Sequence, residues 1–456
     1  MKVDAIVIGA GQAGPTVAAR LAGAGKRVVL IERAALGGTC VNTGCTPTKA
    51  MVASAYAAHL ARRAADFGVS AGPVGVDLAA VVARKDRVVA RSRDGLEDWL
   101  GATEGLTLKR GHARFVAADA VEVAGERIEA PLIVLNVGGR PSMPDFPGVA
   151  DVASLNSSTI LDLSTLPRHL VVVGGSYVGL EFAQMFRRFG AAVTIVERAP
   201  RLVAREDEAT SEALAAILRE EGITVRTGAD CIALAPHPDG VNVHVSCTEG
   251  APEVVGSHVL LAVGRVPNTD DLGLPAAGVA TDARGFITVD DRLQTNVPGI
   301  YALGDCNGRG AFTHTAYNDG EILTDNLLSG DDRKVSDRIP AYALYTDPPL
   351  GRVGLSVAEA KAAGHRVLVG ERPMTRVARA VEKGETAGFM KVVVDADSGR
   401  ILGAALLGVG ADEAVHAILA AMAGGLDARG LARTVFIHPT VSELIPTILG
   451  ELKPVA

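Results

Sequence analysis

The chain has 456 residues, of which 48% are hydrophobic and 21% charged, and its formal net charge is −7. At roughly 150 residues per domain this length predicts about three domains, and the composition excludes a disordered chain or a coiled coil. The chain has no basic stripe and no apolar stretch of the ~20 residues that a membrane span needs, and its five cysteines are too few for a secreted disulfide framework. We therefore expect a cytoplasmic protein that binds neither nucleic acid nor a membrane.

The N-terminal segment predicts a nucleotide-binding unit. An apolar strand leads into Gly9, Gly11 and Gly14, a helical pattern follows, and a second apolar strand ends at Glu32. Such a turn lets a pyrophosphate approach backbone N–H groups at a helix N-terminus, and the acid accepts hydrogen bonds from a ribose. A tight turn without a ligand is the other interpretation of a single motif of this kind.

Two cysteines follow, Cys40 and Cys45, in a glycine-containing segment that precedes a helical run. A helix N-terminus lowers the pKa of a thiol and makes it nucleophilic. As zinc ligands the two lack a second Cys or His pair at a usable spacing. From the residues alone a redox pair and a structural role both remain open, and no metal site is expected.

The first motif recurs in residues 170–197. The interval from the first glycine to the acid is 23 residues in both copies, from Gly9 to Glu32 and from Gly174 to Glu197. Two motifs in register favour two dinucleotide sites over two empty turns. In the second copy Ser176 replaces the middle glycine, and we expect binding to survive this small hydroxyl.

The remaining cysteines have weaker signals. Cys231 and Cys247 lie in strand-like runs and are predicted to be inert small hydrophobic residues. Cys306 directly follows Gly304 and Asp305, which end an apolar strand, but we expect no catalytic role for it.

Together these segments resemble the class I pyridine nucleotide-disulfide oxidoreductases, the flavoprotein family of dihydrolipoamide dehydrogenase, glutathione reductase and mercuric reductase. The resemblance spans essentially the whole chain and includes a last motif from His438 to Glu443. It implies an α/β fold with two doubly wound dinucleotide-binding domains, the second inserted in the first, and a C-terminal α+β dimerisation domain. The expected boundaries are 1–147 and 265–337 for the FAD-binding domain, 148–264 for the NAD(P)-binding domain and 338–456 for the interface domain.

The resemblance also implies the cofactor sites, with FAD at the first turn and a nicotinamide nucleotide at the second. Asp305 would hold the ribityl-phosphate arm of the flavin, and Tyr177 matches a position that can cover the nicotinamide pocket. The implied cofactor-binding residues are Gly9, Gly11, Gly14, Glu32, Gly38, Thr39, Lys49, Gly138, Gly174, Gly175, Ser176, Tyr177, Gly179, Glu197, Gly264, Gly304 and Asp305.

The implied catalytic residues form three pairs. Cys45 would be the thiol next to the flavin and Cys40 the exchange thiol that attacks the substrate. The second pair, Lys49 with Glu181, matches an ion pair beside the isoalloxazine ring. The third, His438 with Glu443, matches an acid/base pair donated across the interface of a homodimer to the partner's cysteines.

The expected reaction passes electrons from the nicotinamide through FAD to the cysteine pair and on to a small disulfide. NADH is favoured because Glu197 would repel a 2′-phosphate, although Arg198, Arg201 and Arg205 leave NADPH possible.

Two alternative functions remain open. The sequence of residues 44–49 and 345–349 looks closer to the mercuric-reductase-like branch than to typical dihydrolipoamide dehydrogenases. This favours a reductase of Hg or Cu ions or an oxidant-response reductase. The printed chain ends without that enzyme's C-terminal cysteine pair, so we expect Hg(II) reduction to be inefficient. A flavoprotein redox sensor is the alternative from another class of protein.

Overall fold

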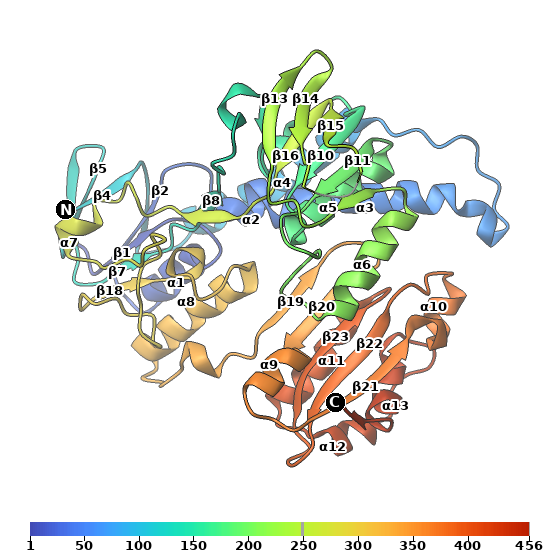
Figure 1. Ribbon diagram of the computed structural model, residues 1–456. Coiled ribbons are helices and arrows are strands. Elements are labelled where there is room, and N and C mark those ends of the chain that lie inside the picture. The colour runs from blue at the N-terminus through green and yellow to red at the C-terminus, as the bar shows by residue number, and fades with distance from the viewer. Residues whose placement is uncertain (248–249, 456) are drawn as a thin grey trace.

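The computed structural model describes residues 1–247 and 250–455, arranged as three lobes that are each built on a sheet (Figure 1). The first lobe contains a parallel five-stranded sheet. Its strands are β1 (Ala5–Ile8), β2 (Val28–Glu32), β3 (Leu106–Arg110), β7 (Ile133–Leu135) and β18 (Ile300–Ala302). They are ordered β18, β7, β1, β2, β3, so a strand from far along the chain completes the sheet.

Successive side chains of these strands face different layers, because a strand directs its side chains to opposite faces in turn. Val7 and Leu30 pack with the helices α1 (Gly14–Gly23) and α8 (Thr313–Leu328). Ile8 and Ile31 pack with a small antiparallel sheet on the other face. The strands of that sheet are β4 (Ala113–Ala117), β5 (Ala120–Val123) and β6 (Glu126–Glu129). Both faces of the parallel sheet are therefore covered, as its continuously apolar strands require.

The second lobe repeats this plan. Its parallel sheet, with the order β12, β11, β10, β16, β9, packs against α5 (Tyr177–Phe189) and α6 (Glu208–Glu220) on one face and an antiparallel sheet on the other. The parallel strands are β9 (Ser154–Leu155), β10 (His169–Val173), β11 (Ala192–Val196), β12 (Thr224–Arg226) and β16 (His258–Leu261). The antiparallel strands are β13 (Ala233–His237), β14 (Gly240–His244) and β15 (Glu253–Gly256).

A two-stranded ribbon joins these two lobes. β8 (Gly139–Pro141) pairs in antiparallel fashion with β17 (Arg265–Pro267), so the chain leaves and re-enters the first lobe side by side. The prediction that the second dinucleotide domain is inserted in the first is confirmed, whereas the exact domain boundaries stay a prediction.

Helices connect β2 to β3 and carry the cysteine segment. They are α2 (Gly38–Thr43), α3 (Cys45–Arg62) and α4 (Leu78–Gly101). α3 contacts both α4 and α5, which places the cysteine segment between the first two lobes (Figure 1).

The third lobe is a six-stranded antiparallel sheet with the helix α11 (Ala411–Ala423) packed on it. Its strands are β19 (Ala341–Leu344), β20 (Leu350–Gly354), β21 (Val367–Pro373), β22 (Phe389–Asp395), β23 (Ile401–Leu407) and β24 (Lys453–Pro454). The short helices elsewhere are α7 (Leu274–Ala277), α9 (Val357–Ala362), α10 (Ala378–Glu382), α12 (Ala428–Ala432) and α13 (Ile445–Leu449). Over the described residues, no helix is both long and apolar enough to cross a membrane.

One prediction about the cysteines is wrong. Cys231 and Cys247 are not separate hydrophobic residues, because their sulfur atoms are joined in a disulfide at the surface of the second lobe. Their positions lie on two turns that the antiparallel pairing of β13 and β14 brings together, and no sequence pattern indicated that pairing.

Candidate active site

The first glycine turn joins β1 to α1. A Cβ atom added at Gly14 would lie 2.0 Å from the carbonyl oxygen of Gly9, and Gly9 itself has a φ of 102°. At Gly138, which precedes β8, an added Cβ would meet nothing within 4 Å. Tightly packed backbone at a helix N-terminus with open space beside it is what a dinucleotide pyrophosphate needs, so these residues fit the expected FAD site.

The second turn has the same construction. Gly174 has a φ of 118°, and a Cβ at Gly179 would lie 1.9 Å from the carbonyl oxygen of Gly174. Ser176 is exposed and its side chain makes no capping hydrogen bond to α5, so the extra hydroxyl does not fill the turn. Gly264, which precedes β17, again has open space around it.

The two acids organise their own turns. Glu32 accepts a hydrogen bond from the backbone N–H of Ala10 at 2.8 Å, and Glu197 accepts one from Gly175. Each also accepts the N–H two residues further on, at 2.7 Å in both copies. The sequence pattern predicted a contact with ribose but not this second role, in which the carboxylate fixes the backbone that would face the nucleotide.

The cysteine pair is held against the first turn. A Cβ at Gly38 would lie 2.8 Å from the Cα atom of Gly11, so only glycine allows α2 to approach so closely. Cys40 lies within α2 and Cys45 begins α3, and both are free thiols. The Cys45 sulfur lies 3.2 Å from the hydroxyl of Thr313, the first residue of α8.

The pKa values of the two thiols are shifted in opposite directions. A hydrogen bond from Cys40 lowers the pKa of the Cys45 thiol to about 6, and Thr313 and the charge of Lys49 act in the same direction while burial and Glu181 oppose it. The same hydrogen bond, followed by burial, raises the pKa of Cys40. The reduced pair therefore holds a thiolate at Cys45 and a proton at Cys40.

Lys49 and Glu181 meet as the resemblance implied. The ammonium nitrogen lies 2.8 Å from a carboxylate oxygen of Glu181, although the residues come from α3 and α5 of different lobes. Glu181 also accepts the backbone N–H of Tyr345 at 3.0 Å, and Lys49 lies over the Tyr345 ring, 4.6 Å from its centroid. This ion pair joins all three lobes beside Cys45.

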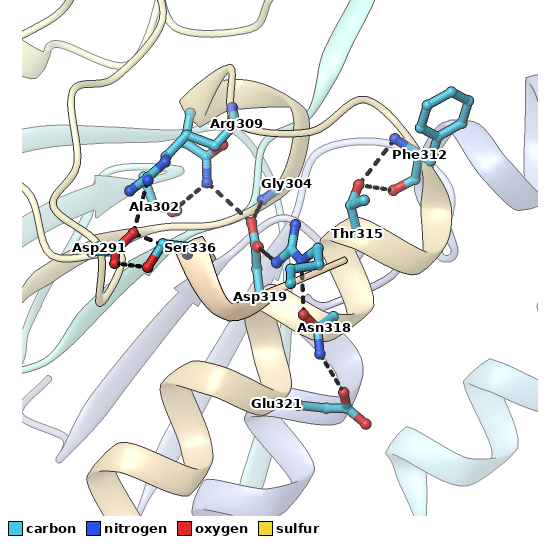
Figure 2. Close-up of polar contacts among 12 residues, drawn as sticks. Asp291, Ala302, Gly304, Arg309, Phe312, Thr315, Asn318, Asp319, Glu321 and Ser336 are labelled. Carbon is cyan, nitrogen blue, oxygen red and sulfur yellow. Dashed lines mark hydrogen bonds and ion pairs between the residues drawn. The ribbon is translucent and has the colours of Figure 1, made fainter. Parts of the chain in front are cut away.

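A buried network positions Gly304 and Asp305, and its central residue was not found by sequence reasoning. Figure 2 shows Asp319 of α8 accepting the backbone N–H of Gly304, a hydrogen bond of 2.8 Å. The same carboxylate pairs with the guanidinium of Arg338. Asn307 donates to the same carboxylate at 3.1 Å. An aspartate inside a helix gives no sequence signal for this role, because it reads as an ordinary surface residue.

Asp305 pairs with Arg265, the first residue of β17. Arg265 Nε lies 3.6 Å from the Asp305 carboxylate. Nη2 of the same guanidinium donates hydrogen bonds to the Gly139 carbonyl and, at 3.4 Å, to the Thr39 hydroxyl. Burial raises the pKa of Asp305, and Arg265 opposes that rise. Arg265 thus links Asp305 to the cysteine helix through Thr39.

Tyr177 is held by Glu206, a residue that the sequence analysis did not identify. Its hydroxyl donates to Glu206 at 2.7 Å, and Tyr342 of β19 donates to the same oxygen atom, also at 2.7 Å. The other oxygen of Glu206 pairs with Arg352 at 2.8 Å, and both side chains are almost fully buried. Glu206 stands in a run of charged residues, a pattern that is typical of a solvated surface segment.

His438 and Glu443 form a close pair on the third lobe. Nδ1 of the ring lies 2.8 Å from a carboxylate oxygen of Glu443, and the His438 side chain is 75% exposed. The neighbouring apolar residues Val435 and Ile437 are 95% and 79% exposed. In Figure 1 the helices α12 and α13, which flank this segment, lie well away from α2 and α3, the helices that carry the cysteines.

Cys306 is fully buried and directs its thiol at the carbonyl oxygens of Leu135 and Leu303. Burial raises its pKa to about 12, so it is neither accessible nor ionised near neutral pH. The absence of a catalytic role for Cys306 stays a prediction.

The chain combines two glycine turns of the dinucleotide-binding kind with a pair of thiols whose pKa values are shifted in opposite directions. These features define its class, a redox protein with two dinucleotide sites and a dithiol. Residues 3–320 match the family model of pyridine nucleotide-disulphide oxidoreductases, and residues 340–448 match the dimerisation domain of that family. The chain belongs to the pyridine nucleotide-disulfide oxidoreductases, which are flavoproteins, and its dimerisation domain supports a homodimer.

Three relatives show the range of activities among similar proteins. The chain is 36% identical over 443 residues to a dihydrolipoyl dehydrogenase of Thermus scotoductus, covering 96% of this chain and 95% of the relative. It is 35% identical over 448 residues to a mercuric reductase of Streptomyces lividans, covering 97% and 94%. The solved Cu(II) complex of the HOCl-induced flavoprotein disulfide reductase RclA from Escherichia coli superposes with a TM-score of 0.90 at 33% identity, covering 99% and 100%.

Proposed function

We propose that this flavoprotein disulfide reductase oxidises NADH and reduces a small disulfide through Cys40 and Cys45. The observation that carries this proposal is the opposite acidity of the two thiols, combined with a histidine–carboxylate pair on the dimerisation domain. A thiolate at Cys45 and a protonated Cys40 are what a dithiol needs before its outer sulfur exchanges with a substrate. When bound, FAD supplies the two-electron exchange between nicotinamide and dithiol.

The residues of the chain divide the work of holding the cofactor. The glycine turn at Gly9 and Gly14 would take the pyrophosphate of FAD, with Glu32 at its ribose and Asp305 at the ribityl-phosphate arm. The Lys49–Glu181 pair would lie beside the flavin ring, and its position near Cys45 supports this assignment. The turn at Gly174 would take the nicotinamide nucleotide.

Exchange with the substrate requires removal of the proton on Cys40, because its raised pKa keeps it protonated near neutral pH. The Cys40 thiolate then attacks one sulfur of the substrate, breaks its S–S bond and forms a mixed disulfide while one substrate thiolate leaves. The Cys45 thiolate attacks the Cys40 sulfur, closes the Cys40–Cys45 disulfide and releases the second thiolate. One leaving thiolate takes up the proton removed from Cys40, and the other takes a proton from solvent, where the proton of Cys45 went when that thiol ionised.

We assign the proton transfers to His438 of the partner subunit. Glu443 binds Nδ1 and so directs Nε2 away from the carboxylate, which orients the ring for use as a base and then as an acid. The exposed apolar residues Val435 and Ile437 support burial of this segment against a second copy. The helices that flank His438 lie well away from those that carry the cysteines of its own chain, which is the reason for assigning it to the cysteines of the partner.

We further propose a preference for NADH over NADPH. A carboxylate at the ribose of the second site repels a 2′-phosphate, and Glu197 is held in place there by two backbone N–H groups. The side chain of Arg201 donates to the carbonyl oxygens of Ala204 and Glu206 in its own loop, at 3.2 and 3.4 Å, rather than standing free for a phosphate. A ratio of kcat/KM values that favours NADPH by about tenfold would overturn this preference.

A reductase of metal ions or an enzyme of the oxidant response is the second candidate. The observation in its favour is the TM-score of 0.90 to a chain solved as a Cu(II) complex of an HOCl-induced flavoprotein disulfide reductase. Electron delivery to a metal ion needs no shuttling of protons between thiols, so this function would not depend on His438.

The test is NADH oxidation by the purified holoenzyme with lipoamide, glutathione disulfide, Hg(II) or Cu(II) offered in parallel, using wild type and His438→Ala. The matched control is His365→Ala, because His365 forms a similar pair on the same domain, with Nδ1 2.8 Å from Asp395. Fast turnover of a disulfide that falls by about 10²-fold or more in His438→Ala but not in His365→Ala is expected. Metal-dependent oxidation that ignores His438→Ala, without disulfide turnover, would support the second candidate instead.

A further inference from the structure

A second pair of sulfur atoms lies outside the site described above. Cys231 lies in the turn between β12 and β13, and Cys247 follows β14, with their Cα atoms 5.9 Å apart across the disulfide. The backbone N–H of Cys231 lies 3.3 Å from the Cys247 sulfur, and the N–H of Cys247 lies 3.1 Å from the Cys231 sulfur. The pair therefore fastens two surface turns of the second lobe to each other.

The turn that carries Cys231 is hydrogen-bonded to the loop of Glu197. The N–H of Glu197 donates to the Arg226 carbonyl at 2.8 Å, and the N–H of Ala229 donates back to the Glu197 carbonyl at 2.9 Å. Ala229 is fully buried and lies two residues before Cys231. Since Glu197 also holds the second glycine turn, an unbroken path of backbone contacts runs from the disulfide to the proposed nicotinamide site.

The turn that carries Cys247 reaches the same point. The buried guanidinium of Arg226 donates to the carbonyl of Val245 at 3.2 Å and to that of Ala251 at 2.6 Å, on the two sides of Cys247. Both ends of the disulfide are thus connected to the strand end next to Glu197.

The hairpin does not depend on this bond for its fold. β13 and β14 are paired along their whole length, from the partners 233 and 244 to the partners 237 and 240, and Leu234, Val241 and Val243 are buried in the core of the lobe. Cleavage of the disulfide would release two surface turns and leave the sheet intact. A disulfide at the surface is also open to attack by a small thiol, in contrast to the buried Cys306.

We propose that Cys231 and Cys247 form a second, reversible thiol–disulfide couple, which controls the affinity of the second lobe for nicotinamide nucleotide. In the reductive direction the thiolate of a small thiol attacks one sulfur, breaks the Cys231–Cys247 bond and forms a mixed disulfide. A second small thiolate attacks the small-thiol sulfur of this mixed disulfide and displaces the protein thiolate, so that two protein thiols and one small disulfide are formed from one protein disulfide and two small thiols. The inference rests on the proposed assignment of the second glycine turn to the nicotinamide nucleotide.

The oxidised form is the one that binds tightly, because the disulfide restrains the two turns that support Glu197. Reduction gives these turns more freedom, and a nucleotide must then order them on binding. Coupling between two such sites is ordinarily at least about fivefold in affinity.

The experiment uses holoenzyme carrying Cys40→Ser and Cys45→Ser, in which the peripheral pair is the accessible dithiol. The protein is equilibrated in glutathione buffers from fully reduced to fully oxidised, the state of the pair is read by alkylation and peptide mass spectrometry, and binding of NAD⁺ is measured by calorimetry. The control adds Cys231→Ser and Cys247→Ser to the same background.

We expect a single transition of the pair across the buffers, with a Kd for NAD⁺ at least about fivefold higher in the reduced form. The control should bind with the weaker affinity in every buffer. A pair that never interconverts, or Kd values that agree within roughly twofold in both states, would overturn the inference and leave the nicotinamide site standing. Failure of every form to bind NAD⁺ or NADP⁺ would instead overturn the assignment of the site, and this inference with it.

Discussion

The acidity of Cys45 depends first on its neighbour Cys40, and replacing Cys40 by alanine tests this dependence. The hydrogen bond from Cys40 is the largest of the effects that lower the pKa of Cys45 to about 6, ahead of Thr313 and Lys49. Cys40→Ala removes the donor and is expected to raise the pKa of Cys45 by more than about one unit, toward the ordinary value of about 8.5. Cys40→Ser keeps a donor and should give a smaller rise.

The size of the effect decides the assay. At pH 7 a thiol with a pKa of about 6 is roughly 90% thiolate, whereas one with a pKa of 8.5 is about 3% thiolate, a difference of about 30-fold. A thiolate of higher pKa is also more nucleophilic, with a Brønsted coefficient of about 0.4–0.5, so much of this loss is compensated in a rate at one pH. The position of the inflection along the pH axis is therefore the quantity to measure.

The assay follows iodoacetamide alkylation of reduced protein from pH 4.5 to 10, with Cys45 quantified by peptide mass spectrometry. In wild type the rate should rise with an inflection near pH 6 and level off above about pH 7, because the thiolate is the reactive form. In Cys40→Ala the inflection moves to higher pH, and Thr313→Val and Lys49→Met should move it less, in that order. An unchanged inflection in Cys40→Ala, or a lower pKa at Cys40 than at Cys45 in wild type, would refute the reasoning.

Two further predictions concern the framework of the site. Gly14→Ala should abolish FAD binding, measured as the flavin absorbance of purified protein, because the new Cβ would lie 2.0 Å from a carbonyl oxygen. Gly23→Ala, at the other end of the same helix, meets nothing within 4 Å and should retain FAD. Equal flavin content in the two variants would contradict the prediction. Glu206→Gln should lower the free energy of unfolding in denaturant by about 3–5 kcal/mol, because it leaves the buried charge of Arg352 unpaired. Glu212→Gln, at an exposed position, should change this free energy little. Similar stability of the two variants would show that the Glu206–Arg352 pair does not stabilise the fold.

The features that the sequence predicted well are those encoded in short, contiguous segments. The turns at Gly9 and Gly174 follow from spacing within about 25 residues. The insertion of one lobe into the other was implied by the resemblance to a known family. The pair of Lys49 and Glu181 joins residues 132 positions apart, and only the resemblance to a known family placed them together.

The features that the sequence did not predict arise from long-range contacts. The sequence pattern around Glu206 and Asp319 is typical of surface residues, yet both acids are buried. Glu206 pairs with Arg352 of the third lobe, and Asp319 pairs with Arg338 of the linker to that lobe. The Cys231–Cys247 bond depends on how far the hairpin between the two cysteines extends, which periodicity does not fix. In each case the sequence shows the residue type but does not show which distant residue it contacts.

The central claim is that the cysteines of one subunit work with His438 of the other, and a hybrid dimer tests it most directly. Cys45→Ser and His438→Ala subunits, carrying different affinity tags, are coexpressed and the heterodimer is isolated; it contains one site with intact cysteines facing an intact His438 and one site that lacks both. The account predicts that each parent homodimer is nearly inactive in disulfide reduction and that the heterodimer recovers roughly half of the wild-type turnover per dimer. A heterodimer as inactive as its parents would contradict it, because His438 would then have to serve the cysteines of its own chain.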